Sequence, residues 1–338
     1  MEVIFKRGVY LPELDFWMDS RRKQEVSLIS HGHSDHTARH QRPILTPNTR
    51  RLLSDYLIRS DPVTLEYCEP LETGKYTLTL YPAGHCLGSA QALLQSKVSG
   101  ERVLYTGDFK VRPNPINEPL EPVACDVLIM ESTYGRPEYI FPAEEQVLAT
   151  ACKTLREWLS RGEKPVVRGW RLGKAQELLY HFLDQGFQVL VEDSVYQIAC
   201  AYRESGVNFP GEFRRFDGGL DGSIDGNWPE GQILICPPGP WSSKNLSGIR
   251  GKRFMDLTGW ATAGGPQWSR RADASLPYSD HADFNELVAY VEQVQPKQVY
   301  TVNGFPELAA HLRQLGYPAV HLNGKGQPED SGFQMKML

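Results

Sequence analysis

Apolar residues in the first third of the chain fall into short runs that are separated by turn residues. Four segments show the apolar or alternating pattern that is typical of β-strands. They are VSLIS (26–30), YTLTLYPAG (76–84), RVLYTGDF (102–109) and DVLIMES (126–132). The last segment has an unbroken apolar centre, which predicts a strand in the middle of a sheet.

The middle of the chain alternates between helical and strand patterns. Helical periodicity covers 143–161, 172–186 and 195–205, and strand patterns cover 164–170, 187–193, 231–238 and 252–260. Strands that alternate with helices at this spacing predict a parallel sheet with crossover connections. The tail adds a helix (284–293), a strand (298–302), a helix (306–315) and a strand (319–322).

The composition narrows the class of protein. A length of 338 residues suits two domains or one large α/β unit. The chain has no run of eighteen apolar residues and no signal-peptide pattern, so we expect no membrane span and a cytoplasmic location. The six cysteines are scattered singly and are expected to be free thiols. The net charge is −5, so contact with nucleic acid would require a local basic patch and metal ions.

A dense cluster of metal-ligand residue types follows the first strand, in SHGHSDH (30–36). Residues two apart in an extended segment point the same way, so His31 and His33 can reach one metal ion. The chain then turns, and Asp35 and His36 can hold a second ion. Imidazole and carboxylate ligands suit Zn²⁺ and also serve Mn²⁺. His40 lies four residues further on and is expected to be a solvated side chain.

Two later segments complete a binuclear site. In AGHCLGSA (83–90), His85 follows a strand between small residues that let the backbone approach a site. In TGDF (106–109), Asp108 stands at a strand end, where its carboxylate can bridge two ions. We therefore predict that His31, His33, His85 and Asp108 hold one divalent ion. Asp35, His36 and the bridging Asp108 would hold the other.

This ordered set of motifs resembles the metallo-β-lactamase superfamily. MESTYG (130–135), RGWRLGKAQELL (168–179) and PYSDHADF (277–284) are similar to motifs of its β-CASP nucleases. The resemblance implies an α/β fold, a metallo-β-lactamase αββα sandwich with an inserted α/β β-CASP cap. The sandwich would comprise residues 1–137 and 277–338, and the cap would comprise residues 138–276.

Longer stretches, from GVYLPELDF to SRRADASLPYSDHADF, resemble bacterial ligase-associated DNA exonucleases. The resemblance implies a two-metal DNA exonuclease of DNA repair that works from the 5′ end and leaves 5′-phosphate products. The substrate of such an enzyme would be single-stranded DNA or DNA with a free 5′ end. The resemblance also implies a functional association with a DNA ligase and a helicase. Zn²⁺ is the expected metal and Mn²⁺ the alternative; the oligomeric state stays open.

One segment departs from the pattern of RNA-cleaving relatives. TVNG (301–304) places Val302 and Asn303 where those enzymes, and also many ligase-associated exonucleases, carry a histidine that helps to hold the second metal. The crosslink-repair nucleases, which the tail also resembles, lack that histidine as well, so the departure favours DNA. It leaves two alternatives for the second metal site: Asn303 donates a carbonyl oxygen, or the site fills only when substrate phosphate arrives.

The resemblance also suggests roles for residues around the metals. Asp35 and Asp108 would act through the metal ions, while His281 would contact the phosphate or protonate the leaving oxygen, with Glu131 orienting it. Candidate phosphate or DNA contacts are Ser132, Thr133, Tyr134, Arg168, Arg171, Lys174, Arg270 and Arg271. Lys174 is the strongest of them, because it follows Gly173 at a predicted helix start where backbone N–H groups favour anions. Trp170, Trp260 and Trp268 are candidates for base stacking, although core packing is the commoner role for tryptophan.

Three other functions remain open at this point. An RNA endonuclease or exonuclease of the same fold would share most of these motifs. A catalytically inactive scaffold subunit would be expected to lose ligands, whereas the ligand loop here is complete. Hydrolysis of a small thioester or lactam would leave the predicted cap without a purpose.

Overall fold

The computed structural model describes residues 1–216, 228–239, 246, 248–262 and 272–323. Its internal contacts divide the chain into two compact units. Unit 1 comprises Met1–Pro113, Asn117–Pro137 and His281–Leu338, and unit 2 comprises Asn114–Ile116 and Glu138–Asp280. Among the residues described, no helix has the length and apolar character that crossing a membrane requires.

Unit 1 contains two sheets. The first has the order β1 (Ile4–Phe5), β2 (Val9–Leu11), β3 (Phe16–Met18), β4 (Val26–Leu28), β5 (Arg42–Leu45) and β6 (Val63–Thr64). The second has the order β19 (Ala319–His321), β18 (Gln298–Gly304), β11 (Val127–Ser132), β10 (Arg102–Tyr105), β9 (Ala90–Ser96), β8 (Tyr76–Pro82) and β7 (Pro70–Glu72). The central position predicted for 126–132 is confirmed, because β11 pairs in parallel with β10 on one side and β18 on the other.

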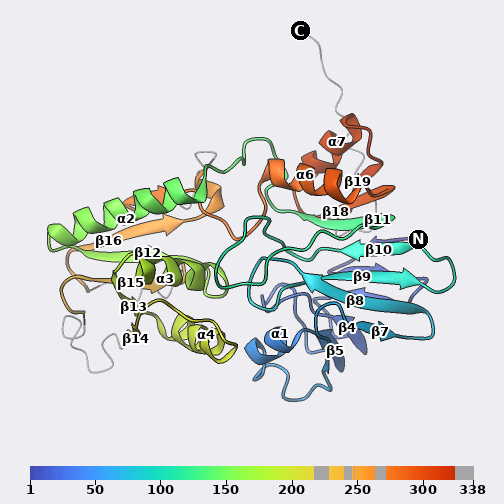
Figure 1. The fold of residues 1–338 in the computed structure, drawn as a ribbon, viewed down its shortest axis with the longest axis horizontal. Helices are drawn as coiled ribbons and strands as arrows, with labels where there is room; N and C mark the ends of the chain where they lie inside the picture. The colour runs from blue at the N-terminus through green and yellow to red at the C-terminus, as the bar shows by residue number, and fades with distance from the viewer. Residues whose placement is uncertain (217–227, 240–245, 247, 263–271, 324–338) are drawn as a thin grey trace, which may run out of the picture. The chain divides into compact units, whose positions relative to one another are not determined.

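The two sheets of unit 1 share one hydrophobic core. Leu28 and Ile44 of the first sheet pack in the same cluster as Leu78 and Val103 of the second. The opposite face of the second sheet is covered by α6 (Phe284–Val294) and α7 (Glu307–Gln314), as Figure 1 shows. Beyond the first sheet, α1 (Pro47–Leu52) follows β5. This layered arrangement is the αββα sandwich that the sequence predicted.

Unit 2 is built on one parallel sheet. Its order is β14 (Phe213–Arg215), β13 (Gln188–Val191), β15 (Gln232–Cys236), β12 (Lys164–Arg168), β16 (Lys252–Leu257) and β17 (Ala274–Leu276). All five strand pairings are parallel, which confirms the prediction from alternating strands and helices. The helices α2 (Glu144–Ser160), α3 (Lys174–Asp184) and α4 (Asp193–Glu204) pack in one cluster with residues of the sheet.

The predicted elements and the observed ones differ mainly in unit 1. The strand β9, with the sequence AQALLQS, was not predicted, because it is buried at six of its seven positions and carries no alternation. The strands β1 to β3 and helix α1 were also missed, since elements of two to six residues carry too little periodicity to recognise.

Candidate metal centre

Three of the predicted site residues lie where strands of unit 1 end. His85 follows β8, Asp108 follows β10, and Glu131 lies near the end of β11. The strands β8 and β10 run in the same direction because both pair antiparallel with β9, and β11 pairs in parallel with β10. These carboxyl ends therefore meet at one edge of the sheet, where the histidine loop (31–36) that follows β4 joins them.

A glycine allows two of these loops to approach closely. Gly107 has a φ of +57°, and a Cβ atom there would lie 2.7 Å from the Oγ atom of Ser30. A larger residue would meet both backbone strain and a clash. The glycine of the TGD motif thus brings Asp108 beside the histidine loop.

The first cluster contains His31, His33, His85 and Asp108, whose ligand atoms all lie within 4.8 Å of one another. The Nδ1 atom of His33 lies 3.0 Å from Nε2 of His31 and 3.1 Å from Nε2 of His85. Burial, followed by the charge of neighbouring His36, holds the pKa of His31 well below its ordinary value. Neutral imidazoles and one carboxylate that converge in this way fit the ligand set of a zinc ion.

His36 lies between carboxylates. Its Nε2 atom is 3.2 Å from Asp108 and 3.7 Å from Asp35, and its Nδ1 atom is 2.7 Å from Asp19. Burial lowers the pKa of His36, but Asp108 and Asp19 outweigh it and leave the pKa well above its ordinary value. Burial would likewise raise the pKa of Asp108, yet His36 holds it well below its usual range. A second divalent cation would displace the His36 proton, since a ligating imidazole is neutral.

Asp19 is a residue of the centre that the sequence analysis missed. Its carboxylate is buried and accepts hydrogen bonds from the Ser30 backbone N–H at 2.7 Å, the Ser30 hydroxyl at 2.6 Å and the Tyr105 hydroxyl at 2.8 Å. It also contacts His36 Nδ1, so it fixes the orientation of that ring. The only signal in the sequence was an aspartate directly after the apolar run FWM, which is too common a feature to single out.

Glu131 and His281 form a third cluster with Asp108. The Nδ1 atom of His281 lies 3.0 Å from both carboxylate oxygens of Glu131. Glu131 is buried and also accepts hydrogen bonds from the Phe109 backbone N–H and the Thr133 hydroxyl. Two residues that lie 150 positions apart in the sequence are therefore a rigid pair beside the predicted metal ligands.

Asp35 lies at the rim of the centre. Its side chain is 61% exposed, in contrast to the buried Asp19 and Asp108, and its backbone carbonyl accepts a hydrogen bond of 2.7 Å from the Arg21 guanidinium. Asp35 is thus the predicted ligand that solvent reaches most easily.

Comparison with known proteins agrees with this geometry. Residues 271–323 match a family described as "Zn-dependent metallo-hydrolase RNA specificity domain". The chain is 36% identical over 334 residues to a "Probable DNA ligase" of Opitutus terrae, covering 97% of this chain and 32% of that protein. It is 27% identical over 343 residues to the "5′ exonuclease Apollo" of Gallus gallus, covering 94% of this chain and 67% of that protein.

These matches support an assignment to the β-CASP branch of the metallo-β-lactamase superfamily. It is also 30% identical over 211 residues to the "Endoribonuclease YSH1" of Yarrowia lipolytica, covering 51% of this chain and 25% of that protein. The chain thus spans about a third of the length of its Opitutus relative and a quarter of its Yarrowia relative.

The hydroxyls predicted to contact phosphate have partners inside the protein. Ser132 is fully buried and donates to the Val302 carbonyl at 3.2 Å. Thr133 donates to Glu131, and Tyr134 is 2% exposed with its ring 6.1 Å from that of His281. These three residues surround the Glu131–His281 pair.

The predicted cations of unit 2 are divided between buried and exposed positions. Arg168 pairs with Asp256, and the buried Lys174 pairs with Asp280 at 2.9 Å. Arg171 is exposed. Arg270 and Arg271, and with them Trp268, lie outside the described residues.

A basic patch near the histidine loop was not predicted. It consists of five exposed residues of unit 1, namely Lys6, Arg7, Arg21, Arg22 and Lys23. The Arg21 backbone N–H donates to the Arg7 carbonyl at 2.7 Å, which joins the two segments. None of the five forms an ion pair with another residue in the ranges that the structure describes. The runs KR and RRK were the available signal, and the negative total charge concealed it.

The prediction for His40 was wrong. Its side chain is 1% exposed, and its Nδ1 atom accepts a hydrogen bond of 3.1 Å from the Gln24 backbone N–H. Burial lowers the pKa of His40 to about 4. His40 is therefore a neutral residue of the interior.

The tail motif ends β18 at a bulge. The register with β11 shifts between Glu131 and Ser132, and Asn303 has a φ of +54°. The Asn303 carbonyl accepts from the Thr133 hydroxyl at 3.4 Å, so this backbone oxygen faces the Glu131 side of the centre.

Proposed function

We propose that the chain is a metal-dependent nuclease that hydrolyses DNA from the 5′ end and leaves 5′-phosphate products. The observation that carries the proposal is the convergence of three clusters of ligand-type side chains that share His31 or Asp108. A site built for one structural ion would need only four such groups. The surplus is typical of two-metal centres for phosphodiester chemistry.

The donor atoms fit two divalent ions of the Zn²⁺ or Mn²⁺ class. His31, His33, His85 and Asp108 would hold one, and Asp35, His36 and Asp108 the other. Such ions neutralise charge on the phosphate and make a water molecule more acidic. Asp19 holds His36 by its Nδ1 atom, so that Nε2 is presented to the ion.

Glu131 and His281 supply proton chemistry on the other side of Asp108. The Glu131 carboxylate accepts the Nδ1 proton of His281, which leaves Nε2 to contact the phosphate or to protonate the leaving oxygen. A buried carboxylate at 3.0 Å favours the charged form of the imidazole. Thr133 and the Phe109 N–H hold Glu131 in place, so we assign Glu131 to positioning.

DNA is the preferred substrate in this proposal for two reasons. The Gallus relative is named a 5′ exonuclease and the Opitutus relative a DNA ligase, and Val302 and Asn303 stand where RNA-cleaving enzymes carry a histidine. We extend the proposal to a role in DNA repair beside a DNA ligase and a helicase. The basic patch and Arg171 would contact backbone phosphates.

RNA cleavage is the second candidate. It is favoured by the likeness to an endoribonuclease and by the RNA specificity named for the family that matches residues 271–323. Both candidates use the same metal centre, so only the substrate separates them.

The deciding experiment compares 5′-labelled single strands of DNA and RNA with one sequence, in Zn²⁺ or Mn²⁺. We expect labelled mononucleotide from DNA first, lost in Asp35→Ala but retained in Asp61→Ala, which removes an exposed carboxylate that lies 3.7 Å from the Arg42 guanidinium. Faster internal cutting of RNA would overturn the DNA proposal and support RNA cleavage. Absence of metal-dependent cleavage of either strand would overturn both.

A further inference from the structure

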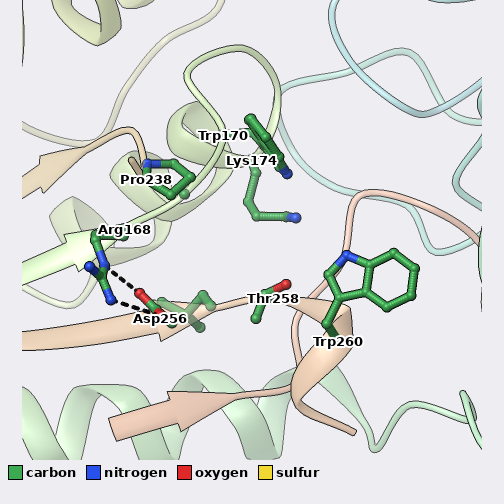
Figure 2. Close-up of a pocket in the computed structure, with 9 residues that line it drawn as sticks. Arg168, Trp170, Lys174, Pro238, Asp256, Thr258 and Trp260 are labelled. Atoms are coloured by element: carbon green, nitrogen blue, oxygen red, sulfur yellow. Dashed lines mark hydrogen bonds and ion pairs between the residues drawn. The ribbon is translucent and has the colours of Figure 1, made fainter. Parts of the chain in front are cut away.

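Unit 2 contains a pocket that the metal chemistry does not use. It is lined by Arg168, Gly169, Trp170, Lys174, Pro238, Asp256, Leu257, Thr258 and Trp260. Four of these residues, Arg168, Trp170, Lys174 and Trp260, are the sequence candidates for phosphate binding and base stacking. Figure 2 shows the two indoles at different ends of the pocket, with Lys174 and Thr258 between them in this view.

The topology of the sheet explains the position of the pocket. Arg168 ends β12, Leu257 ends β16, and Pro238 follows β15, so the pocket lies at the carboxyl ends of three adjacent parallel strands. The chain leaves β12 through α3 toward β13 on one side, whereas it leaves β16 toward β17 on the other. Open parallel sheets bind ligands at such a change of direction, because the diverging connections leave a crevice there.

The charges in the pocket are already compensated. The Arg168 guanidinium donates two hydrogen bonds to Asp256, at 2.5 and 2.8 Å, as the dashed lines in Figure 2 mark. The Lys174 ammonium lies 2.9 Å from Asp280, and both side chains are almost completely buried. A phosphate would have to compete with two carboxylates that are fixed in place, so the pocket favours a neutral ligand with polar edges.

The aromatic side chains define the shape of that ligand. Trp170 is 54% exposed, and it is the sole aromatic side chain among the large exposed apolar residues in the part of the chain that the structure describes. Trp260 is held on the 3-10 helix η1 (Gly259–Ala261) by an edge-to-face contact with Tyr139, with ring centroids 5.3 Å apart. An exposed indole and a half-buried one, at a mainly apolar crevice with a few polar groups, suit a flat aromatic ring.

We propose that this pocket binds an unpaired nucleobase of the substrate strand by stacking on Trp170, with Trp260 as a second aromatic wall. Lys174 and Thr258 provide polar groups for the edge of the base. The inference rests on the proposed nucleic-acid substrate and deepens it. A base in a duplex has its edge paired and its faces stacked, so this pocket selects single-stranded ends.

The first test measures binding of labelled adenosine to the full chain by equilibrium dialysis, with ribose and inorganic phosphate as competitors. We expect saturable adenosine binding that neither competitor displaces. Trp170→Ala should weaken it about five-fold or more and Trp260→Phe by a smaller factor, while Trp17→Phe, which alters a stacked tryptophan of unit 1, should leave it unchanged. Displacement by phosphate, or unchanged affinity in both pocket variants, would overturn the proposal.

The second test uses short single-stranded DNA in which one base at a time is replaced by an abasic residue. At one position, the abasic replacement should weaken binding of the strand to the wild-type protein about five-fold or more. The Trp170→Ala variant should bind that abasic strand no more weakly than the intact strand. An equal loss of affinity in the wild type and in Trp170→Ala would contradict the proposal that this pocket binds the base.

The two proposals fail separately. Asp108→Asn should abolish hydrolysis yet keep adenosine affinity, because the pocket lies within unit 2. Hydrolysis of DNA without adenosine binding would overturn only the proposal that the pocket binds a base. Adenosine binding that depends on Trp170, in a protein that cleaves neither DNA nor RNA, would remove the nuclease proposal alone.

Discussion

The two units place charged side chains at the ends of parallel strands in opposite ways. In unit 1, the buried carboxylates Asp19 and Asp108 face histidines, and one imidazole with a raised pKa lies between them. In unit 2, Arg168 and Lys174 each have a carboxylate of their own. The side chains of unit 1 offer more ligand atoms than their own contacts use, and divalent cations could bind to them. The ion pairs of unit 2 are neutral without any added ion.

This difference separates two tasks that the sequence assigned to a single list of polar residues. Unit 1 carries groups that can hold metal and move a proton. Unit 2 carries a neutral crevice between indoles. Proximity of charged residues therefore says little about function until each charge is matched with its partner.

The largest expected effect is at the shared carboxylate. Asp108→Asn removes the one group that belongs to both predicted ion sites, and loss of several kcal/mol of charge stabilisation corresponds to at least about a 10³-fold fall in kcat. Metal content measured by mass spectrometry should fall with it. Asp126→Asn, which breaks a surface pair with Lys297, is the control. Retained metal and activity in Asp108→Asn would remove the two-metal assignment.

The second prediction tests whether the ion pairs of unit 2 are structural. Lys174→Met leaves Asp280 buried without its cation, which should lower the free energy of unfolding by about 3–5 kcal/mol. The double variant Lys174→Met with Asp280→Leu should recover most of this loss in urea unfolding. Unchanged stability in the single variant would mean that the Lys174–Asp280 pair is not structural, and the contrast between the units would disappear.

The third prediction concerns the residue that orients His36. Asp19→Asn should weaken metal affinity or activity by about 10- to 100-fold, because it removes a charged partner from a ligating imidazole. Asp15→Asn is the matched control, since Asp15 is exposed and accepts a hydrogen bond of 2.8 Å from the Tyr10 hydroxyl. An equal effect of both variants on metal titration would show that Asp19 has no special role.

The smallest effect is expected at the basic patch. Replacing Arg21, Arg22 and Lys23 by alanine should raise KM and make binding less dependent on salt, by about 0.7 in the logarithmic slope for each lost phosphate contact. Replacing Lys153, Arg156 and Arg161 of unit 2 removes the same charge as a control. If binding depended equally on salt concentration in the two triple variants, the basic patch would have no specific contact with the phosphates of the strand.

The fold could be predicted largely from periodicity. In unit 2, apolar strands of four to six residues alternate with amphipathic helices, and the parallel sheet follows from that pattern. The strand β9 escaped because it is buried on both faces, so its residues show no alternation. The alternation of apolar and polar residues reflects which side chains are exposed. A strand that is buried on both faces therefore gives no such signal.

The chemistry was visible in sequence where ligands lie close together in motifs. The histidine loop contains four ligand-type residues within six positions, and His85 and Asp108 each stand beside a small residue after a strand. Asp19 contributes as much to the geometry, yet nothing marks it, because its partners come from other segments. His40 shows the reverse error, since a histidine near a ligand loop proved to be buried in the interior.

The sequence by itself determined the layered α/β architecture and the set of metal-ligand residue types, and it carried the resemblance to β-CASP nucleases. The tertiary structure alone decided which charges are paired, because an ion pair such as Lys174–Asp280 joins residues that lie far apart in the chain. It also decided that Ser132 faces inward and that Trp170 faces solvent. The physical reason is that residue type sets what a side chain can do, whereas its partners and exposure depend on how distant segments pack.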